Sequence, residues 1–560
     1  MQTTDTVLGT PSTMGDDEQL TTTRLLRDAA RTFGDQQIIH TRGGGAPWQT
    51  TTYAAVWERV RRMAAALRVE GIGPGDRIGL LLWNDVRHLE SYFSVPLLGA
   101  TMVQLNLRLA PTDLAYVITH AQVGTIIVDE TLLDLAAALE PHLPEGLRWI
   151  VAGDGEIPEA WAERDDVLSY ERMLAGQEPL EIAELPAVDE RSASGACYTT
   201  GTTGRPKGVF YSHRSTWLHA NAVVATLGMT MADTALLLTP MFHAQCWGLP
   251  FAAVAVGARL VLPGRFNLTD TPWLTSTLVD HGVTVAPAAP AILMPMLHHL
   301  RTLETPPRMD GVRLLCGATE PPVAMMRGFD ELTGAEVIHA YGATETSPIV
   351  SLNRMKPGLA ATLSEEERWN LKRFQGLVVV GVDVKITDPM GTPLPPGEEN
   401  VGEIRLRGPW VTASYADNPE ATEAGFDEEG YWRSGDIGYL SPEGYLKVTD
   451  RLKDVVKSGG EWISSIDLEN HIMTVPGVRD AAVIGVPHPQ WEERPLALVV
   501  RAEGSDVGPE AVLAALGERF AQWQLPDEVR FVEEIDRTSV GKINKRKLRD
   551  DYADALTSGR

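Results

Sequence analysis

The chain has few cysteines and no long uninterrupted apolar run. Its three cysteines, Cys197, Cys246 and Cys316, are far apart and match neither a disulfide framework nor the spacing of zinc ligands. The amino terminus lacks a basic region followed by an apolar core, and Pro or Arg interrupts the longest apolar stretches. We therefore expect no signal peptide, no integral membrane segment and a reducing, cytoplasmic location.

Positive charge is also scarce, with 49 Lys and Arg against 75 Asp and Glu and a formal net charge of −26. This excess disfavours nonspecific binding to nucleic acid or to an anionic membrane surface, so an anionic substrate would need a locally basic pocket. A soluble acidic surface that implies no partner is the simplest explanation of the charge. The length of 560 residues, with 44% hydrophobic residues, predicts a globular protein of two or more domains.

Helix-length segments alternate with short apolar runs over the first several hundred residues. Between Thr52 and Glu70, apolar residues recur at helical spacing before Gly71, which predicts an amphipathic helix. Strands alternating with helices indicate parallel sheets covered on both faces. The predicted strands include Arg77–Leu82, Thr125–Asp129, Trp149–Ala152, Ala235–Thr239, Arg259–Leu262 and Val312–Leu315.

The pattern changes near Gly376, where LVVVGVDVKITD and GEIRLRG alternate as antiparallel strands do. We interpret this region as a smaller β-rich subdomain. A further boundary is expected near Asp450, after the turn SPEGY. The predicted fold is α/β: a large N-terminal domain, residues 1–449, with parallel-sheet layers plus the β-rich subdomain, and a small mobile α+β C-terminal domain, residues 450–560.

The segment TTGTTGRPKG, Thr199 to Gly208, follows an apolar run and combines small, hydroxyl and cationic residues. Small residues let backbone amides approach phosphate oxygens, hydroxyls donate to them, and Lys207 adds positive charge. It is not a Walker A loop, because Lys207 follows Pro206 and no Ser or Thr comes next. The segment predicts a phosphate cradle outside the kinase and GTPase classes.

This loop resembles the signature loop of the adenylate-forming family of acyl-CoA synthetases, luciferases and peptide-synthetase adenylation domains. A second family signature is YGATET, Tyr341 to Thr346. The resemblance implies Glu345 and Thr199 as magnesium ligands, which suits a hard cation bridging ATP phosphates. It also implies nucleotide binding by Thr200, Gly201, Thr202, Thr203, Gly204, Lys207, Gly317, Ala318, His339, Ala340, Tyr341, Gly342 and Thr344.

Three later motifs extend the resemblance over nearly the whole chain. YWRSGDIG presents Asp436 to the ribose, DRLKDVVKSGGEWIS resembles the family hinge, and RTSVGKINKRKL carries Lys542. By resemblance, Lys542 bridges the carboxylate and α-phosphate oxygens during adenylation. The hinge motif implies ribose contact by Arg451, rotation at Lys453, nucleotide proximity of Lys457 and Trp462, and passage of the coenzyme A arm at Gly459 and Gly460.

The acid pocket is less well specified. PMFHAQCWGLPF resembles the family's aromatic segment, with His243 near the reacting carboxylate and Trp247 as a substrate gate. The resemblance is closest to bacterial medium- and long-chain fatty acyl-CoA synthetases. Enzymes acting on short thioether or aryl acids remain alternatives. Glu320, in CGATEPP, departs from the family's small residue, and the sequence leaves open whether it faces solvent or the pocket.

The expected reaction joins a carboxylic acid to AMP with release of pyrophosphate and then transfers the acyl group to coenzyme A. ATP, Mg²⁺ and coenzyme A are the expected cofactors and co-substrates, and a homodimer is possible. One rival is an enzyme that loads a separate carrier protein or stops at the adenylate. Another is a catalytically silent nucleotide-binding fold, which the retention of Lys542, Glu345 and Asp436 disfavours. A luciferase-like oxygenation has little support in the sequence.

Overall fold

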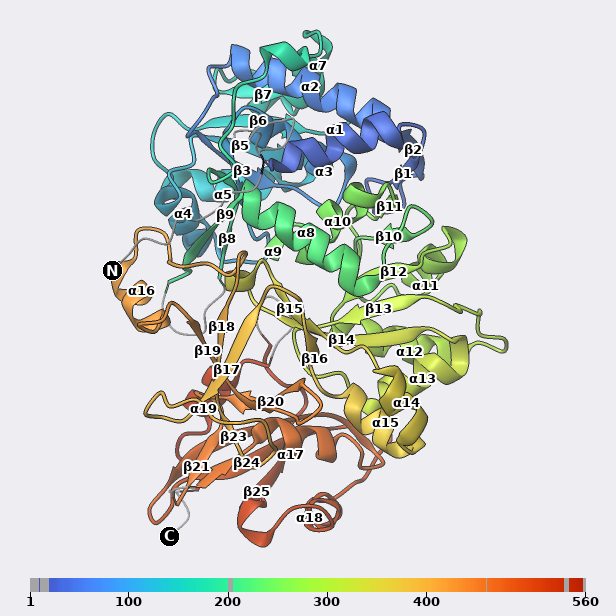
Figure 1. Ribbon diagram of the computed structural model, residues 1–560, viewed down its shortest axis with the longest axis vertical. Coiled ribbons are helices and arrows are strands. Elements are labelled where there is room, and N and C mark those ends of the chain that lie inside the picture. The colour runs from blue at the N-terminus through green and yellow to red at the C-terminus, as the bar shows by residue number, and fades with distance from the viewer. Residues whose placement is uncertain (1–9, 11–19, 200–204, 460, 538–542, 557–560) are drawn as a thin grey trace.

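Three sheets organise the protein, whose computed structural model describes residues 10, 20–199, 205–459, 461–537 and 543–556 (Figure 1). The first is seven-stranded and parallel except for its last strand, β9, which runs antiparallel to β8. Its strands in spatial order are β7 (Val167–Ser169), β6 (Arg148–Ala152), β5 (Thr125–Asp129), β3 (Arg77–Leu81), β4 (Thr101–Gln104), β8 (Ala193–Tyr198) and β9 (Gly208–Ser212).

The second sheet has thirteen strands and changes from parallel to antiparallel pairing within itself. Within it, β1 and β10 to β14 pair in parallel, the edge strand β2 pairs antiparallel with β1, and the pairings from β14–β15 onward, through β20, are antiparallel. Their spatial order is β17 (Asp383–Thr387), β18 (Gly402–Arg407), β19 (Trp432–Leu440), β20 (Tyr445–Arg451), β16 (Gly376–Val378), β15 (Ile349–Leu352), β14 (Glu336–Gly342), β13 (Arg313–Cys316), β12 (Val285–Ala288), β10 (Thr234–Leu236), β11 (Arg259–Leu262), β1 (Gln37–His40) and β2 (Gln49–Thr52).

Antiparallel pairing therefore begins at β15, earlier than the sequence boundary expected near Gly376. Strand β15 is a short, wholly buried run, and burial on both faces removes the polar alternation that marks a half-exposed antiparallel strand. The β-rich region shares one hydrogen-bonded sheet with the parallel strands.

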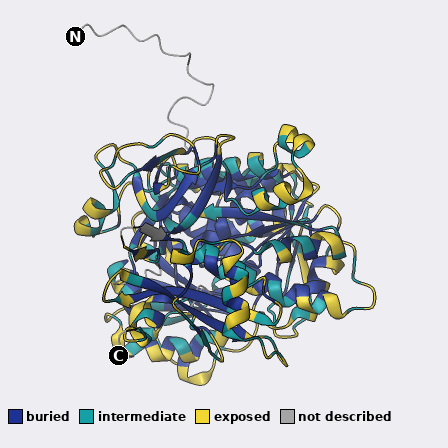
Figure 2. Cartoon of the chain, turned by 90° about the horizontal axis from the view of Figure 1, so that it is seen from below, coloured by how far each residue is buried: buried dark blue, intermediate teal, exposed yellow. Residues whose placement is uncertain are grey.

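Helices cover both faces of each large sheet. Alternation along the strands divides their side chains between cores: Ile127 joins the largest core, whereas its neighbours Ile126 and Val128 join another. The largest core unites one face of each sheet with α1 (Thr22–Thr32), α2 (Tyr53–Val69), α3 (Val86–Leu97), α8 (His213–Leu227) and α10 (Leu249–Val256). The outer faces carry α4 (Pro111–His120) and α5 (Leu133–Leu139) on one sheet, and α11 (Thr271–Asp280), α12 (Pro290–Thr302) and α13 (Val323–Thr333) on the other. Figure 2 shows these strands buried, with exposed segments at the periphery.

Local sequence signals predict these elements closely. The predicted helix Thr52–Glu70 is confirmed as α2, and the Thr52 side chain caps it by accepting from the Ala55 N–H at 3.3 Å. The predicted strands Thr125–Asp129 and Arg259–Leu262 coincide with β5 and β11. Strand β10, by contrast, ends at Leu236, three residues before the predicted end.

The third sheet forms a C-terminal module, which we define as the elements from β21 to α19. One face packs on α17 (Ser465–Ile472) and α18 (Pro509–Gly517), and the other packs on α19 (Lys545–Asp551). This arrangement confirms an α+β unit. Its strands are β22 (Glu461–Ile463), β21 (Val456–Ser458), β24 (Glu492–Arg501), β23 (Val478–His488) and β25 (Glu528–Phe531). Among the described residues, no helix is long and apolar enough to cross a membrane.

We expect Phe93→Ala to destabilise the protein by about 3–5 kcal/mol, because it empties a fully buried site in the core between the large sheets. Phe93 also loses its edge contact with Phe251, whose ring centroid is 5.7 Å away. Urea denaturation followed by tryptophan fluorescence measures the change. Val380→Ala is the control, because Val380 is 92% exposed. Equal unfolding midpoints for the two variants would contradict the assignment of this core.

Candidate active site

Two neighbouring strands hold the ends of the glycine-rich loop. Thr199 follows β8, and Lys207 precedes β9. The Thr199 N–H donates to the Lys207 carbonyl oxygen at 2.9 Å, and the Lys207 N–H donates to Thr199 Oγ1 at 3.2 Å. The base of the predicted phosphate cradle is therefore closed by hydrogen bonds. Its middle residues, Thr200, Gly201, Thr202, Thr203 and Gly204, lie outside the described residues.

Glu345 lies in a short 3₁₀ turn, η4 (Thr344–Thr346), just beyond β14. Its carboxylate is largely buried and accepts a 2.7 Å hydrogen bond from the Tyr415 hydroxyl at Oε1. Burial raises the pKa of Glu345, and the bond from Tyr415 and the charge of Lys207 oppose that rise. The turn is tied to β9 by Tyr211, whose hydroxyl donates to the Thr344 carbonyl at 2.7 Å.

Tyr415 joins the two predicted phosphate-side elements, and the sequence analysis missed it. Its ring centroid lies 4.6 Å from Lys207 Nζ, while its hydroxyl binds Glu345 and accepts from Trp432 Nε1 at 3.1 Å. Tyr415 stands in a turn before α16 (Pro419–Gly425), and its neighbours suggest only that turn. No local pattern signals a contact with a carboxylate 70 residues earlier.

The predicted ribose-side residues meet at Asp436. The Tyr341 hydroxyl donates to Asp436 Oδ2 at 2.6 Å, and Arg451 Nε lies 3.3 Å from Oδ1. The carboxylate has further lone pairs with which to accept two ribose hydroxyls. Strand β14 contributes Tyr341, β19 contributes Asp436, and β20 contributes Arg451, so the antiparallel half of the sheet assembles this cluster.

Gly317 and the predicted gate lie against each other. A Cβ atom on Gly317 would come within 2.9 Å of Trp247 Cη2 and 3.2 Å of the Ala340 carbonyl oxygen. Any residue larger than glycine at position 317 would therefore displace the Trp247 indole. The next residue, Ala318, has a φ of +76° and turns the chain away from β13. Gly342 is equally constrained, because its Cβ would lie 1.8 Å from the Pro348 carbonyl oxygen.

The segment that carries His243 and Trp247 is strained. Four consecutive residues, which form the short turn α9 (Ala244–Trp247), have φ values between +44° and +56°. Left-handed backbone costs roughly 1–2 kcal/mol per residue for side chains with a Cβ. Surrounding packing holds the segment, since Trp247 is buried and the Cys246 N–H donates to the His243 carbonyl at 3.0 Å. Strain of this kind is common where a side chain must be held for function.

His339 on β14, a predicted nucleotide-side residue, and Glu320, which lies beyond β13 and whose role the sequence left open, both have buried side chains. His339 is fully buried, and burial lowers its pKa to about 4, so the ring is neutral at pH 7. Its Nδ1 donates to the Arg373 carbonyl at 2.9 Å. Glu320, which the sequence left between solvent and pocket, does not face solvent: its side chain is 3% exposed and binds Arg373 Nε at 2.6 Å and Lys447 Nζ at 2.5 Å.

Lys453 lies near the Asp436 cluster, whereas the hairpin residues predicted to guide coenzyme A contact the C-terminal module. Lys453 occupies the exposed turn between β20 and β21. The β21–β22 hairpin carries Lys457, Gly459 and Trp462, and its described contacts lie within the C-terminal module: the Lys457 N–H donates to Glu493 Oε2 at 3.0 Å, and the Gly459 N–H to the Trp491 carbonyl at 2.9 Å. Gly460 and Lys542 lie outside the described residues.

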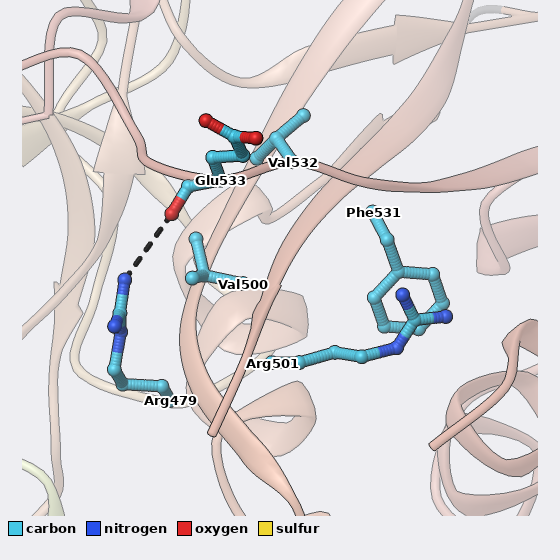
Figure 3. A pocket seen from close by; sticks show the side chains of 6 residues that line it. All are labelled: Arg479, Val500, Arg501, Phe531, Val532 and Glu533. Carbon is cyan, nitrogen blue, oxygen red and sulfur yellow. Dashed lines mark hydrogen bonds between the residues drawn. The ribbon is translucent and has the colours of Figure 1, made fainter. Parts of the chain in front are cut away.

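A separate hollow on the C-terminal module contains none of the predicted site residues. Arg501 lies over the Phe531 ring, 3.6 Å from its centroid, and Arg479 donates to the Glu533 carbonyl at 3.2 Å (Figure 3). Both guanidinium groups are thus already engaged. The hollow is lined by Arg479, Val500, Arg501, Phe531, Val532 and Glu533.

The residues around Glu345 suit a magnesium ion held mainly by a nucleotide. No group of three or more His, Cys, Asp or Glu side chains that could hold a metal ion occurs among the described residues. Mg²⁺ needs only one or two carboxylates when substrate phosphates complete its octahedral shell. Glu345 accepts the Tyr415 bond at Oε1, a carboxylate can hold a cation through its second oxygen, and the Thr199 hydroxyl is a further oxygen of the required kind.

Two family matches cover most of the chain. Residues 26–416 match the AMP-binding enzyme family, and residues 467–542 match the AMP-binding enzyme C-terminal domain. The chain belongs to the AMP-binding enzyme family. The first match spans the glycine-rich loop, Glu345 and Tyr415, and the second lies in the C-terminal module. This AMP-binding enzyme is an AMP-forming acid–thiol ligase, an acyl-CoA synthetase of the adenylate-forming group.

Curated relatives and solved structures cover nearly the whole length. The chain is 42% identical to a long-chain-fatty-acid–CoA ligase from Thermus thermophilus, with 97% of each chain covered. It is 37% identical to a 3-methylmercaptopropionyl-CoA ligase from Ruegeria lacuscaerulensis, over 95% of this chain and 97% of the relative. The anthranilate CoA ligase AuaEII in complex with anthranoyl-AMP has a similar fold, with a TM-score of 0.82 at 24% identity, covering 96% of this chain and 98% of that structure.

We expect Tyr415→Phe to raise the magnesium concentration for half-maximal adenylate formation by about tenfold, because Glu345 loses a charge-assisted hydrogen bond. Without that bond the pKa of Glu345 rises further. A metal ion held by Glu345 would need the ionised carboxylate, so the acid limb of the rate profile should move to higher pH. Pyrophosphate exchange at varied Mg²⁺ and pH measures both effects.

The control is Tyr445→Phe, which removes a hydroxyl bonded to Lys356 and Arg354 on another part of the sheet. It should leave the magnesium requirement and the pH profile unchanged. An unaltered magnesium requirement in Tyr415→Phe would show that Glu345 does not depend on this contact.

Proposed function

We propose that this acid–thiol ligase activates medium- or long-chain fatty acids. In the first step a carboxylate oxygen attacks the α-phosphorus of ATP, forming acyl-AMP and releasing pyrophosphate. In the second the thiol of coenzyme A attacks the acyl carbon, forming the thioester and releasing AMP. The observation that carries the adenylation step is the cluster in which Tyr415 contacts both Glu345 and Lys207, beside the Asp436 cluster.

Each cluster has a proposed role toward ATP. The glycine-rich loop and Lys207 bind the phosphates, with Glu345 and Thr199 holding Mg²⁺, which offsets phosphate charge when bound. Asp436 and Arg451 bind the ribose. The adenine lies beside the backbone of Gly317, Ala318 and residues 339–342.

The acid is proposed to enter past Trp247, with its carboxylate near His243. Trp247 is buried beside Gly317, so its indole separates the acyl side from the adenine side. Support for fatty acids comes from relatives named as long-chain and medium-chain fatty-acid–CoA ligases, at 42% and 36% identity.

The two steps are proposed to use different placements of the C-terminal domain, residues 450–560, on the N-terminal domain, residues 1–449. Lys542 stabilises the adenylation transition state, and rotation about Lys453 then brings Gly459 and Gly460 to the site. Lys453 suits this role because it lies in an exposed turn between two strands. Lys457 and Trp462 move with the same hairpin.

Two alternatives compete for the substrate and the acceptor. The relatives named 3-methylmercaptopropionyl-CoA ligase favour a short thioether acid, and those named for cinnamate and benzoate favour an aryl acid. The acceptor alternative is a separate carrier protein instead of free coenzyme A.

A panel of acids tests the proposal, with straight-chain acids from four to eighteen carbons beside thioether and aryl acids. ATP, Mg²⁺ and coenzyme A are supplied, and AMP release and thioester formation are measured separately. We expect the highest kcat/KM for acids of about eight or more carbons. A maximum on the thioether or aryl acid would refute the fatty-acid assignment, and AMP without thioester would favour a carrier-protein acceptor.

We expect Lys542→Ala to abolish adenylate formation from acid and ATP, because the transition state loses a positioned positive charge. Thioester formation from supplied acyl-AMP and coenzyme A should stay within a fewfold of wild type. Lys547→Ala is the matched control, since Lys547 is exposed and pairs with Asp536 and Asp551. Equal loss of both half-reactions in Lys542→Ala would contradict its role.

We expect Lys453→Pro to slow thioester formation at least tenfold more than adenylate formation, because proline fixes φ at the residue proposed to rotate. Single-turnover assays with acid and ATP, and with supplied acyl-AMP and coenzyme A, separate the two rates. Lys453→Ala removes the same side chain without restricting the backbone, and this variant should form the thioester at the wild-type rate. A proline variant with unchanged transfer would place the pivot elsewhere.

A further inference from the structure

Glu320 is the centre of a buried charge cluster outside the proposed nucleotide contacts. Both of its oxygens are occupied: Oε1 binds Arg373 Nε at 2.6 Å, and Oε2 binds Lys447 Nζ at 2.5 Å. Burial alone would raise the pKa of Glu320, but Lys447 and Arg373 bring it below its ordinary value. The carboxylate is therefore ionised at neutral pH.

The cluster continues into the C-terminal module. Helix α17 supplies two partners: Asn470 Nδ2 donates to Glu320 Oε1 at 3.1 Å, and Asp467 Oδ1 accepts from Arg373 Nη2 at 3.0 Å. Glu320, Arg373 and Lys447 all precede the hinge turn, whereas Asp467 and Asn470 follow it. These contacts thus join the two sides of the hinge.

The charges of the cluster balance only when α17 is in its present position. The N-terminal side contributes one carboxylate and two cations, which leaves one positive charge unmatched. Asp467 completes the balance, with its side chain 26% exposed and those of Arg373 and Lys447 at 11% and 7%. Moving α17 away would break the Arg373–Asp467 ion pair and leave the cluster with one unbalanced positive charge.

The same cluster touches the proposed adenine side. Glu320 lies two residues beyond Ala318, and Arg373 accepts at its carbonyl from His339 Nδ1. One residue, Arg373, therefore contacts the adenine-side strand through its backbone and α17 through its guanidinium.

The arrangement that the cluster stabilises keeps the glycine hairpin away from the nucleotide clusters. The described contacts of Lys457 and Gly459 are with Glu493 and Trp491, inside the C-terminal module. Figure 1 shows β21 near the lower end of the molecule, with β8 and β9 far above it. Thiol transfer, in the proposed function, requires the hairpin to leave this position.

We infer that Glu320, Arg373 and Lys447 form an electrostatic latch for Asp467 and Asn470 of α17, which holds the C-terminal module in its adenylation placement and must open before thiol transfer. These are positioning residues, since none touches the reacting atoms. The inference rests on the proposed two-step function. It gives Glu320, whose position usually has a small residue in the family, a role in holding the two domains together.

The first test changes only the C-terminal side of the latch, so that Glu320 keeps both cations. In Asp467→Asn/Asn470→Ala, the ratio of the thioester-forming rate to the adenylate-forming rate should rise about 5- to 30-fold, the factor that a loss of one or two kcal/mol of latch stability produces in the equilibrium between placements. Thioester formation from supplied acyl-AMP should be maintained or faster. Asp506→Asn is the matched control, because it removes one exposed carboxylate of the same module.

Module placement is measured directly with spin labels at Val380→Cys and Glu518→Cys, two exposed positions on opposite sides of the hinge. The three native thiols are buried and do not compete for the label. Wild type should give one dominant distance, and the double variant should increase a second distance population by a similar 5- to 30-fold ratio. Asp506→Asn should match wild type.

An unchanged distance distribution in the double variant would overturn the latch. Equal loss of both half-reactions would also overturn it, because a general loosening of the protein would slow adenylate formation and thioester formation alike. Adding Lys447→Met to Asp467→Asn restores the charge count, and the distances should return toward wild type; no return would also overturn the inference. If wild type activates no acid, the proposed function fails, while the distances still decide whether the latch exists.

Discussion

Strand β14 pairs in parallel with β13 and antiparallel with β15, and the nucleotide side of the site depends on this double pairing. The parallel half brings loops to the carboxyl ends of its strands, where ligands of α/β sheets bind. The antiparallel half returns the chain so that β19 and β20 reach the same place. Gly342 permits that return, because a Cβ there would collide with the Pro348 carbonyl. The contact between Tyr341 and Asp436 is the result.

Much of this architecture follows from local sequence. Apolar spacing and capping by Thr52 predict α2, and short apolar runs predict β5 and β11 with the bounds that the structure has. The motifs around Tyr341, Asp436 and Arg451 predict three residues that the fold gathers into one cluster. Their roles toward ATP stay predictions, as does that of Lys542.

Contacts between distant segments are what the sequence does not predict. Tyr415 reaches Glu345 across 70 residues, and Lys447 reaches Glu320 across 127. No local sequence pattern around a tyrosine in a loop or a lysine in a strand predicts contact with a distant carboxylate. The two carboxylates differ for the same reason: Glu320 has two cations against it and a lowered pKa, whereas Glu345 has a hydroxyl and a raised one. Glu320 is thus bound in a charge cluster, whereas the proposed role of Glu345 is to hold a metal ion.

The three buried cysteines have a consequence for a protein that handles a free thiol. Cys197, Cys246 and Cys316 are unpaired, and burial raises the pKa of each, to about 12 for Cys197. Thiol–disulfide exchange requires an accessible thiolate. Oxidised coenzyme A, or glutathione disulfide, would therefore find no accessible thiolate on the folded protein, so a shift of the thiol pool towards disulfide would deplete the thiol substrate without forming a mixed disulfide on the ligase itself.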